Sequence, residues 1–206
     1  MSASLSCGTR PSQKWEGRKP DLRAAIGYTL LAMALGVSAK AAYIPTKAVV
    51  AQVMLERAFT QSLASGQPVK AWAWADTWPV ARLEIGRIGA QAIVLKGASG
   101  EALAFGPSLL DETSRIGERG TAVIAAHRDT HFAFLKDVVV GDVVTLTRVD
   151  GLRFDYRVTG TRVADADASG IDRHAPGFHL VLSTCYPFDA VMHGKQRYIV
   201  EAELVK

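Results

Sequence analysis

From Val80 to the end of the chain, short runs of Val, Ile, Leu, Thr and Tyr alternate with Gly, Asp and Pro. Such runs are typical of strands bounded by turns, and Asp150-Gly151 between two of them favours a tight hairpin. Eight short strands predict an all-β domain, a closed barrel or a sandwich, rather than alternating βαβ units. The predicted strands cover residues 81–88, 92–95, 103–105, 121–126, 142–149, 152–164, 178–185 and 196–205.

A different pattern fills residues 24–44, which are uncharged except for Lys40. If that lysine reaches toward the surface, about twenty such residues can span a bilayer as a transmembrane helix. The preceding tail holds five Lys and Arg against two acidic residues, so it is expected in the cytoplasm and the rest of the chain outside. A signal peptide cleaved after Val37-Ser38-Ala39 is the alternative, and it also leaves the rest outside.

Apolar residues with helical spacing from Ala48 to Leu63 predict one more helix, with Thr46 as its cap. A segment rich in tryptophan leads from this helix to the first strand. The sequence therefore predicts four parts: a cytoplasmic basic tail (1–23), a transmembrane anchor (24–44), a helix and Trp-rich lead-in (45–79), and a β domain (80–206).

The formal net charge of +4 is concentrated in the tail, whose five basic and two acidic residues contribute +3. The remaining chain carries only +1 and has no basic stripe interleaved with aromatic residues. We therefore expect no nucleic-acid partner.

Candidate chemistry begins at Cys185, which ends a run of apolar and β-branched residues just before Pro187. The strand predicted at 196–205 returns as the second half of a hairpin and brings Arg197 back beside the thiol. A guanidinium there favours negative charge and can hold an oxyanion or a carbonyl. His127 ends another apolar run, so its imidazole can reach the same rim of a barrel.

Cys185 has no intramolecular disulfide partner if the anchor separates it from Cys7, the second cysteine. Such a thiol is either an inert core residue or kept for its reactivity. His127 and His131 stand four apart, but a third zinc ligand is not evident. The carboxylates of residues 165–176 match no regular calcium loop. We expect no metal and no cofactor.

The residues around these three positions resemble the sortase family of cysteine transpeptidases. The resemblance rests on Ala-Ala-His-Arg-Asp-Thr-His-Phe around His127, on Leu182-Ser183-Thr184-Cys185, and on Arg197 twelve residues later. Residues 73–79, 103–107 and 184–190 are similar to the Gram-negative, marine-proteobacterial type. One departure is Ala126, where sortases often have Gly before the histidine.

The resemblance implies an eight-stranded β-barrel with a substrate groove. It implies Cys185 as nucleophile, His127 as general acid and base, Arg197 as clamp for the oxyanion and substrate, and Ser183 and Thr184 as substrate-binding residues. The substrate would be a secreted protein with a C-terminal Leu-Pro-x-Thr-Gly-like sorting signal, passed through a thioacyl intermediate to an amine or to water. The enzyme would sit in a bacterial inner membrane with its catalytic domain in the periplasm.

Two alternatives stay open. L,D-transpeptidases and other periplasmic cysteine hydrolases also use Cys and His, although the His-Gly pair expected before an L,D-transpeptidase cysteine is absent from Ser183-Thr184-Cys185. A non-catalytic, membrane-tethered β domain would instead bury Cys185 as an unreactive thiol.

Overall fold

The computed structural model describes residues 22–190 and 194–205. Its first element is helix α1 (Leu22–Ser65), in which the side chains of residues 22, 24, 25 and 38–48 are not described. The predicted tail lies outside the described residues except for its last two, and so does Cys7. Within the described part of the chain, no helix combines the length and apolar character needed to cross a membrane.

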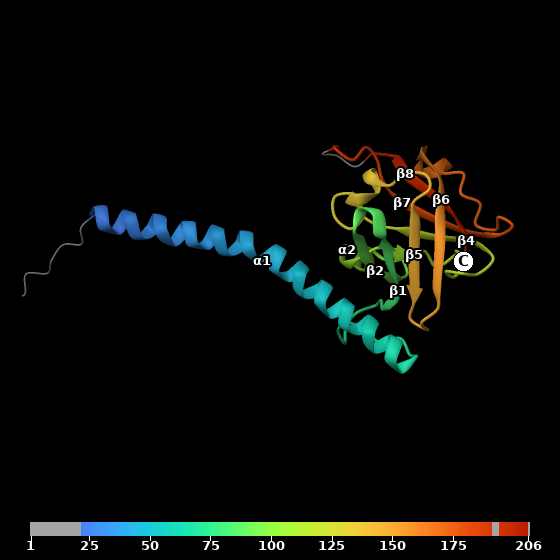
Figure 1. Ribbon diagram of the computed structural model, residues 1–206. Coiled ribbons are helices and arrows are strands. Elements are labelled where there is room, and N and C mark those ends of the chain that lie inside the picture. The colour runs from blue at the N-terminus through green and yellow to red at the C-terminus, as the bar shows by residue number, and fades with distance from the viewer. Residues whose placement is uncertain (1–21, 191–193, 206) are drawn as a thin grey trace, which may run out of the picture. The chain divides into compact units, whose positions relative to one another are not determined.

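Chain contacts divide the protein after Pro45, and the second unit, from Thr46 onward, contains a closed β-barrel (Figure 1). The strands follow the order β1-β2-β3-β4-β7-β8-β6-β5 around the barrel. The β2–β3 and β4–β7 pairs are parallel and the other pairs are antiparallel. The eight strands are β1 (Pro79–Ile85), β2 (Ala90–Lys96), β3 (Ser108–Leu109), β4 (Gly120–Ala125), β5 (Val143–Arg148), β6 (Arg153–Asp165), β7 (Phe178–Cys185) and β8 (Gln196–Leu204).

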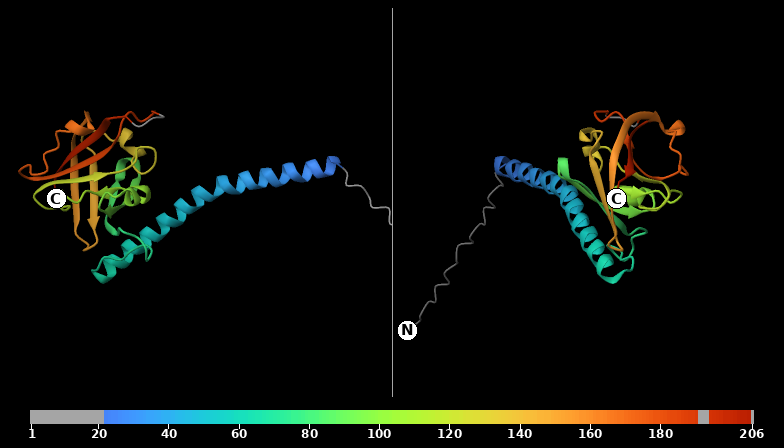
Figure 2. Two further views of the ribbon diagram at one scale, coloured as in Figure 1. Left: turned by 180° about the vertical axis from the view of Figure 1, so that it is seen from behind. Right: turned by 45° about the vertical axis from the view of Figure 1, so that its right-hand side comes forward.

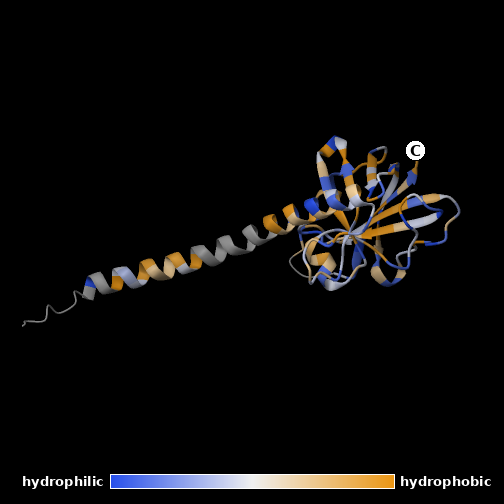
Figure 3. Cartoon of the chain, turned by 90° about the horizontal axis from the view of Figure 1, so that it is seen from below, coloured by the Kyte–Doolittle hydropathy of each residue, from blue (hydrophilic) through white to orange (hydrophobic). Residues whose placement is uncertain are grey.

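Alternating side chains along the strands give the closed barrel an apolar interior. In β1 every second residue is buried, so Leu83 and Ile85 point inward while Arg82 and Glu84 are half-buried. The interior cluster also takes in Ile124 of β4. Figure 3 shows the apolar residues along the barrel strands in orange. Burial of this apolar surface is the main stabilising contribution to the barrel.

The C-terminal part of α1 covers one outer face of the barrel. Leu55 and Phe59 are buried against Ile93 and Leu95 of β2. Thr46 was predicted to cap the start of a helix. Instead it lies inside α1, which runs without a break from Leu22 to Ser65. Three connections between strands within the described residues contain short 3₁₀ helices, η1 (Gly86–Ile88), η2 (Ala133–Asp137) and η3 (Ala166–Ala168).

The predicted strand at residues 103–105 is wrong, because these residues belong to helix α2 (Gly100–Phe105). Ser99 caps this helix: its hydroxyl accepts a hydrogen bond of 3.1 Å from the amide of Ala102. The third strand follows as β3, only two residues long. The other seven predicted strands and the eight-stranded barrel are confirmed, with boundaries shifted by a few residues.

Candidate active site

Strands β4 and β7 run parallel, and both end at the same rim of the barrel. Their register pairs Ala125 with Ser183, and the amide of Ala126 donates a hydrogen bond of 3.2 Å to the Ser183 carbonyl. His127 lies two residues beyond the first member of this pair, and Cys185 lies two residues beyond the second. Because paired strands are about 5 Å apart, this register brings the imidazole segment alongside the thiol segment.

Strands β7 and β8 form the hairpin expected from the sequence, and Cys185 pairs directly with Arg197. Both strands lie at the red end of the colour scale in Figure 2. Cys185 is half-buried and is not part of the apolar interior. The Arg197 guanidinium donates to the carbonyl oxygens of Gly194 and Gln196, at 3.2 and 3.0 Å. These bonds hold the guanidinium at the turn next to the thiol.

Strand alternation sends Ser183 and Thr184 to opposite faces. Thr184 is buried, and its hydroxyl donates a hydrogen bond of 2.7 Å to the Ala126 carbonyl. Ser183 faces outward and lines a cavity of about 300 Å³ together with Arg197. Of the two residues predicted to bind substrate, only Ser183 therefore lines this cavity.

The cavity floor comes from the outer faces of β4, β7 and β8, and its walls come from two loops. The linker after β6 supplies Ala166, Ser169, Ile171 and Arg173, while the segment after β3 supplies Leu110 and Thr113. Arg173 also pairs with Glu112 at 2.6 Å, which joins the two walls. The length of the linker at residues 165–176 indicated from sequence that it could shape a site, but the individual wall residues and the contribution of Leu110 and Thr113 are seen only in the structure.

His127 is exposed at the rim, whereas the residues directly before and after it, Ala126 and Arg128, are buried. Burial lowers the pKa of His131 below its usual value; a hydrogen bond to the Ala104 carbonyl raises it, and the nearby His127 lowers it further. His131 is therefore held toward its neutral form close to His127. Among residues 22–190 and 194–205, no group of three or more His, Cys, Asp or Glu residues could hold a metal ion.

Arg128 has a role that was not expected from the sequence: its side chain is buried and donates hydrogen bonds to backbone carbonyls of the β7–β8 loop. The one feature of the sequence that could have indicated a role for Arg128 is its position directly after the candidate catalytic histidine. A charge next to a strand end is more often solvated, so the sequence alone did not indicate this burial.

The protein is thus a closed mixed β-barrel in which a directly paired cysteine and arginine, Cys185 and Arg197, lie at the same rim as the segment that carries His127. Residues 83–205 match the sortase domain family. Sortase D of Bacillus subtilis (strain 168) is 32% identical over 124 residues, which make up 60% of this chain and 62% of that protein. The match thus spans less than two thirds of that relative's length.

Solved structures agree in fold. Clostridium perfringens Sortase D5 transpeptidase is similar with a TM-score of 0.61 and 21% identity, over 77% of this chain and 99% of that chain. The catalytic domain of B. anthracis SrtD is similar with a TM-score of 0.51 and 30% identity, over 62% of this chain and 88% of that chain. The protein belongs to the sortase family.

Proposed function

We propose that this protein is a sortase-type cysteine transpeptidase that acts on the C-terminal sorting signal of secreted proteins. The observation that carries the proposal is the direct pairing of Cys185 with Arg197 beside the end of β4, where His127 follows. Family membership supports the same activity, and Cys185 is half-buried and is not part of the apolar interior. We place the protein in the Gram-negative type because of its residues 73–79, 103–107 and 184–190.

In the first half of the reaction, the Cys185 thiolate attacks the carbonyl carbon of the scissile Thr–Gly bond and a carbon–sulfur bond forms. The negative charge that develops on the carbonyl oxygen faces the Arg197 guanidinium, which stabilises it. The carbon–nitrogen bond then breaks, and protonated His127 gives its proton to the leaving amine. The products are a thioester on Cys185 and a free Gly-containing peptide.

In the second half, an incoming amine attacks the thioester carbonyl while neutral His127 accepts its proton. The carbon–sulfur bond breaks, the Cys185 thiolate returns, and the substrate leaves with a new amide bond. Water in place of the amine would release a free carboxylate. No step requires a redox partner, because every bond change is an acyl transfer.

The cavity that Ser183 and Arg197 line is the site that we propose for an apolar side chain of the substrate peptide. Leu110, Val123 and Ile171 supply its apolar contacts, and Ser183 adds a hydroxyl. We therefore assign Ser183 to substrate binding. Thr184 acts indirectly, because its buried hydroxyl bonds to Ala126 rather than lining the cavity.

We further propose that residues 24–44 anchor the enzyme in the inner membrane, with the basic tail in the cytoplasm and the barrel in the periplasm. The uncharged stretch and the five basic residues before it support this orientation. In the described part of α1 from Ile26 to Val37, the large apolar side chains are exposed. Fractionation of cells that express the full chain tests this: the protein should stay with membranes after an alkaline carbonate wash, and release into the wash would contradict anchoring.

The activity is tested by trapping the acyl enzyme. The full chain carrying Cys7→Ser is incubated with a Leu-Pro-x-Thr-Gly peptide, and intact-protein mass spectrometry should detect a covalent adduct that hydroxylamine releases. Cys185→Ala in the same background should give no adduct. If Cys185→Ala forms the adduct as well, or if Cys185 resists every thiol reagent in the folded protein, the transpeptidase proposal is wrong.

A further inference from the structure

Arg128 follows His127 directly, and its guanidinium is almost completely buried, with 3% of the side chain exposed. Its Nη1 group donates a hydrogen bond of 2.7 Å to the carbonyl of Pro187, and its Nη2 group donates to the carbonyl of Ala190. Its Nε group donates to the carboxylate of Asp129 at 3.0 Å. The buried charge is thus surrounded by acceptors, as a buried guanidinium requires.

The two carbonyl acceptors belong to the loop that leaves the thiol. Pro187 is two residues after Cys185, and Ala190 is five residues after it. Arg128 therefore joins the residue after the histidine to the loop after the cysteine. On the other side of the pair, Thr184 joins the residue before the cysteine to the residue before the histidine. Side-chain bonds to backbone carbonyls thus bracket His127 and Cys185 from both sides.

The chemistry of the partners explains why arginine suits this position. Two carbonyls from different points of one loop need two donors held in a plane, which the guanidinium fork supplies and an ammonium group does not. The Asp129 carboxylate is 65% exposed, so its ion pair with Arg128 is screened by solvent. The loop carbonyls are consequently the more important partners for placing the β7–β8 loop.

We infer that Arg128 is a positioning residue that fixes the β7–β8 loop to the His127 segment and thereby sets the distance between imidazole and thiol. This inference rests on the proposed function, because it needs His127 to act on Cys185. Misplacement of reacting groups by about 1 Å can cost on the order of 100-fold in rate. Loss of the Arg128 bonds should therefore slow the chemical step more than it weakens substrate binding.

The test is a double-mutant cycle read out on Cys185 itself. In the full chain carrying Cys7→Ser, the rate of alkylation by iodoacetamide is measured for the parent, Arg128→Met, His127→Ala and the double variant. We expect each single substitution to change the rate and the double variant to match His127→Ala, because Arg128 acts through the histidine. With a cleavable peptide, Arg128→Met should lower kcat by about 10- to 100-fold with little change in KM, and Arg128→Lys should restore part of it.

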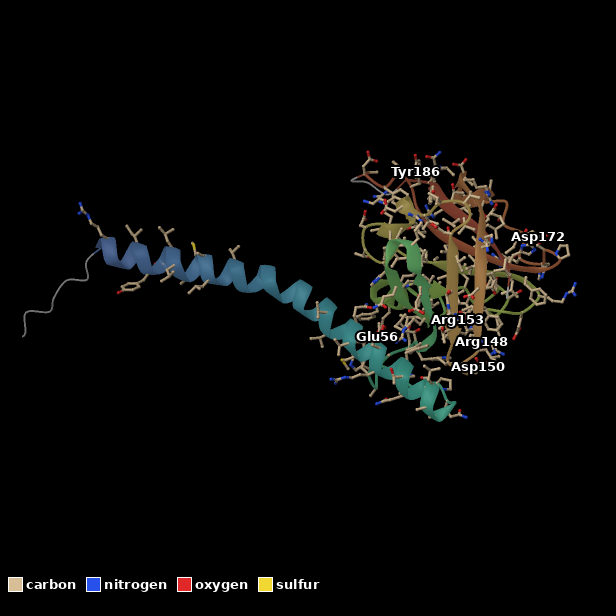
Figure 4. The ribbon with its side chains drawn as sticks, viewed as in Figure 1. Glu56, Arg148, Asp150, Arg153, Asp172 and Tyr186 are labelled. Atoms are coloured by element: carbon tan, nitrogen blue, oxygen red, sulfur yellow. The ribbon has the colours of Figure 1, made fainter. Side chains whose placement is uncertain are left out.

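Arg148 provides a matched control. Its side chain is 14% exposed, donates 2.9 Å to the carbonyl of Ile116 and pairs with Asp150. Figure 4 shows Arg148 and Asp150 at the opposite end of the barrel from Tyr186, the residue after Cys185. Arg128→Met and Arg148→Met should both lower the Tm, because each removes hydrogen bonds from a largely buried guanidinium, but Arg148→Met should leave the alkylation rate and kcat unchanged.

The outcomes separate the inference from the proposed function. One outcome is that His127→Ala lowers the rates of alkylation and peptide cleavage while the double variant shows the full sum of the two single effects on the activation free energy. In that case the positioning role is wrong and the proposed function stands. The same conclusion follows if Arg148→Met slows the chemistry equally. If His127→Ala changes neither rate, the proposed function fails and the inference fails with it.

Discussion

The hydroxyl of Thr184 donates a hydrogen bond of 2.7 Å to the carbonyl of Ala126, across the ends of two parallel strands. The amide of Ala126 in turn donates to the carbonyl of Ser183 at 3.2 Å. Both backbone groups of the residue before His127 are therefore bound to the two residues before Cys185. This contact therefore fixes the positions of the two segments that carry His127 and Cys185 relative to each other.

Replacing Thr184 by Val tests the contact, because Val has the same shape but no hydroxyl. The substitution leaves the buried Ala126 carbonyl without this donor, which should cost about 1–3 kcal/mol in the free energy of unfolding. Thr184→Ser keeps the hydroxyl and should retain more of both stability and kcat. Urea denaturation and peptide-cleavage kinetics measure the two effects. Equal kcat for the Val and Ser variants would show that the hydrogen bond does not position the site.

Most of the barrel could be predicted from sequence because its strands are bounded by strong turn signals. Asp150-Gly151 does form the turn between β5 and β6, with Gly151 at φ +82°. The segment at residues 103–105 was mistaken for a strand, because three apolar residues fit either a short strand or a turn of helix. The cap at Ser99 favours a helix over residues 100–105, and the hydrogen bond that it accepts from the Ala102 amide is seen only in the structure.

Part of the candidate site could likewise be predicted from sequence, and part could not. Cys185 and Arg197 could be paired from sequence because a short hairpin fixes which residues face each other. The proximity of the His127 segment depends on the parallel β4–β7 pairing between strands separated by β5 and β6, which no local pattern specifies. The burial of Arg128 depends on loop carbonyls and was equally invisible.

Ser183 offers a test of the cavity as the place where substrate binds. Its side chain is half-buried and points into the cavity of about 300 Å³ that Arg197 also lines. Ser183→Leu should fill part of this space and raise KM, with a small effect on the Tm because the residue faces outward. Ser183→Ala is the matched control and should change KM much less. An unchanged KM for Ser183→Leu would place the bound peptide elsewhere.

His131 should make the stability of the barrel depend on pH. Burial lowers its pKa in the folded protein, so the unfolded chain takes up a proton near pH 6.5 while the folded chain resists it. The contribution of a neutral His131 is complete above this pH and declines as the pH falls below it. The free energy of unfolding should therefore drop between pH 7.5 and pH 5.5, and the drop should be smaller in His131→Gln. An identical drop in both proteins would assign the pH dependence to other groups.

Gly117 and Gly151 form a matched pair that separates backbone strain from steric conflict. Both have positive φ angles, +81° and +82°, which an L-residue adopts at a cost of about 1–2 kcal/mol. A Cβ atom at Gly117 would lie 2.2 Å from the ring of Phe154, whereas at Gly151 it would meet nothing within 4 Å. The Gly117 amide also donates to the Tyr156 hydroxyl at 2.8 Å, which leaves this turn little freedom to shift.

Gly151→Ala should therefore cost only the backbone strain, while Gly117→Ala should cost clearly more because Phe154 or the turn must move. Urea denaturation of the two variants measures the difference in the free energy of unfolding. Both positions lie away from Cys185 in sequence and structure, so alkylation of the folded protein should proceed at the parent rate in each. Equal losses at the two glycines would mean that the Phe154 ring moves aside without cost, and that the turn at Gly117 is not fixed by packing.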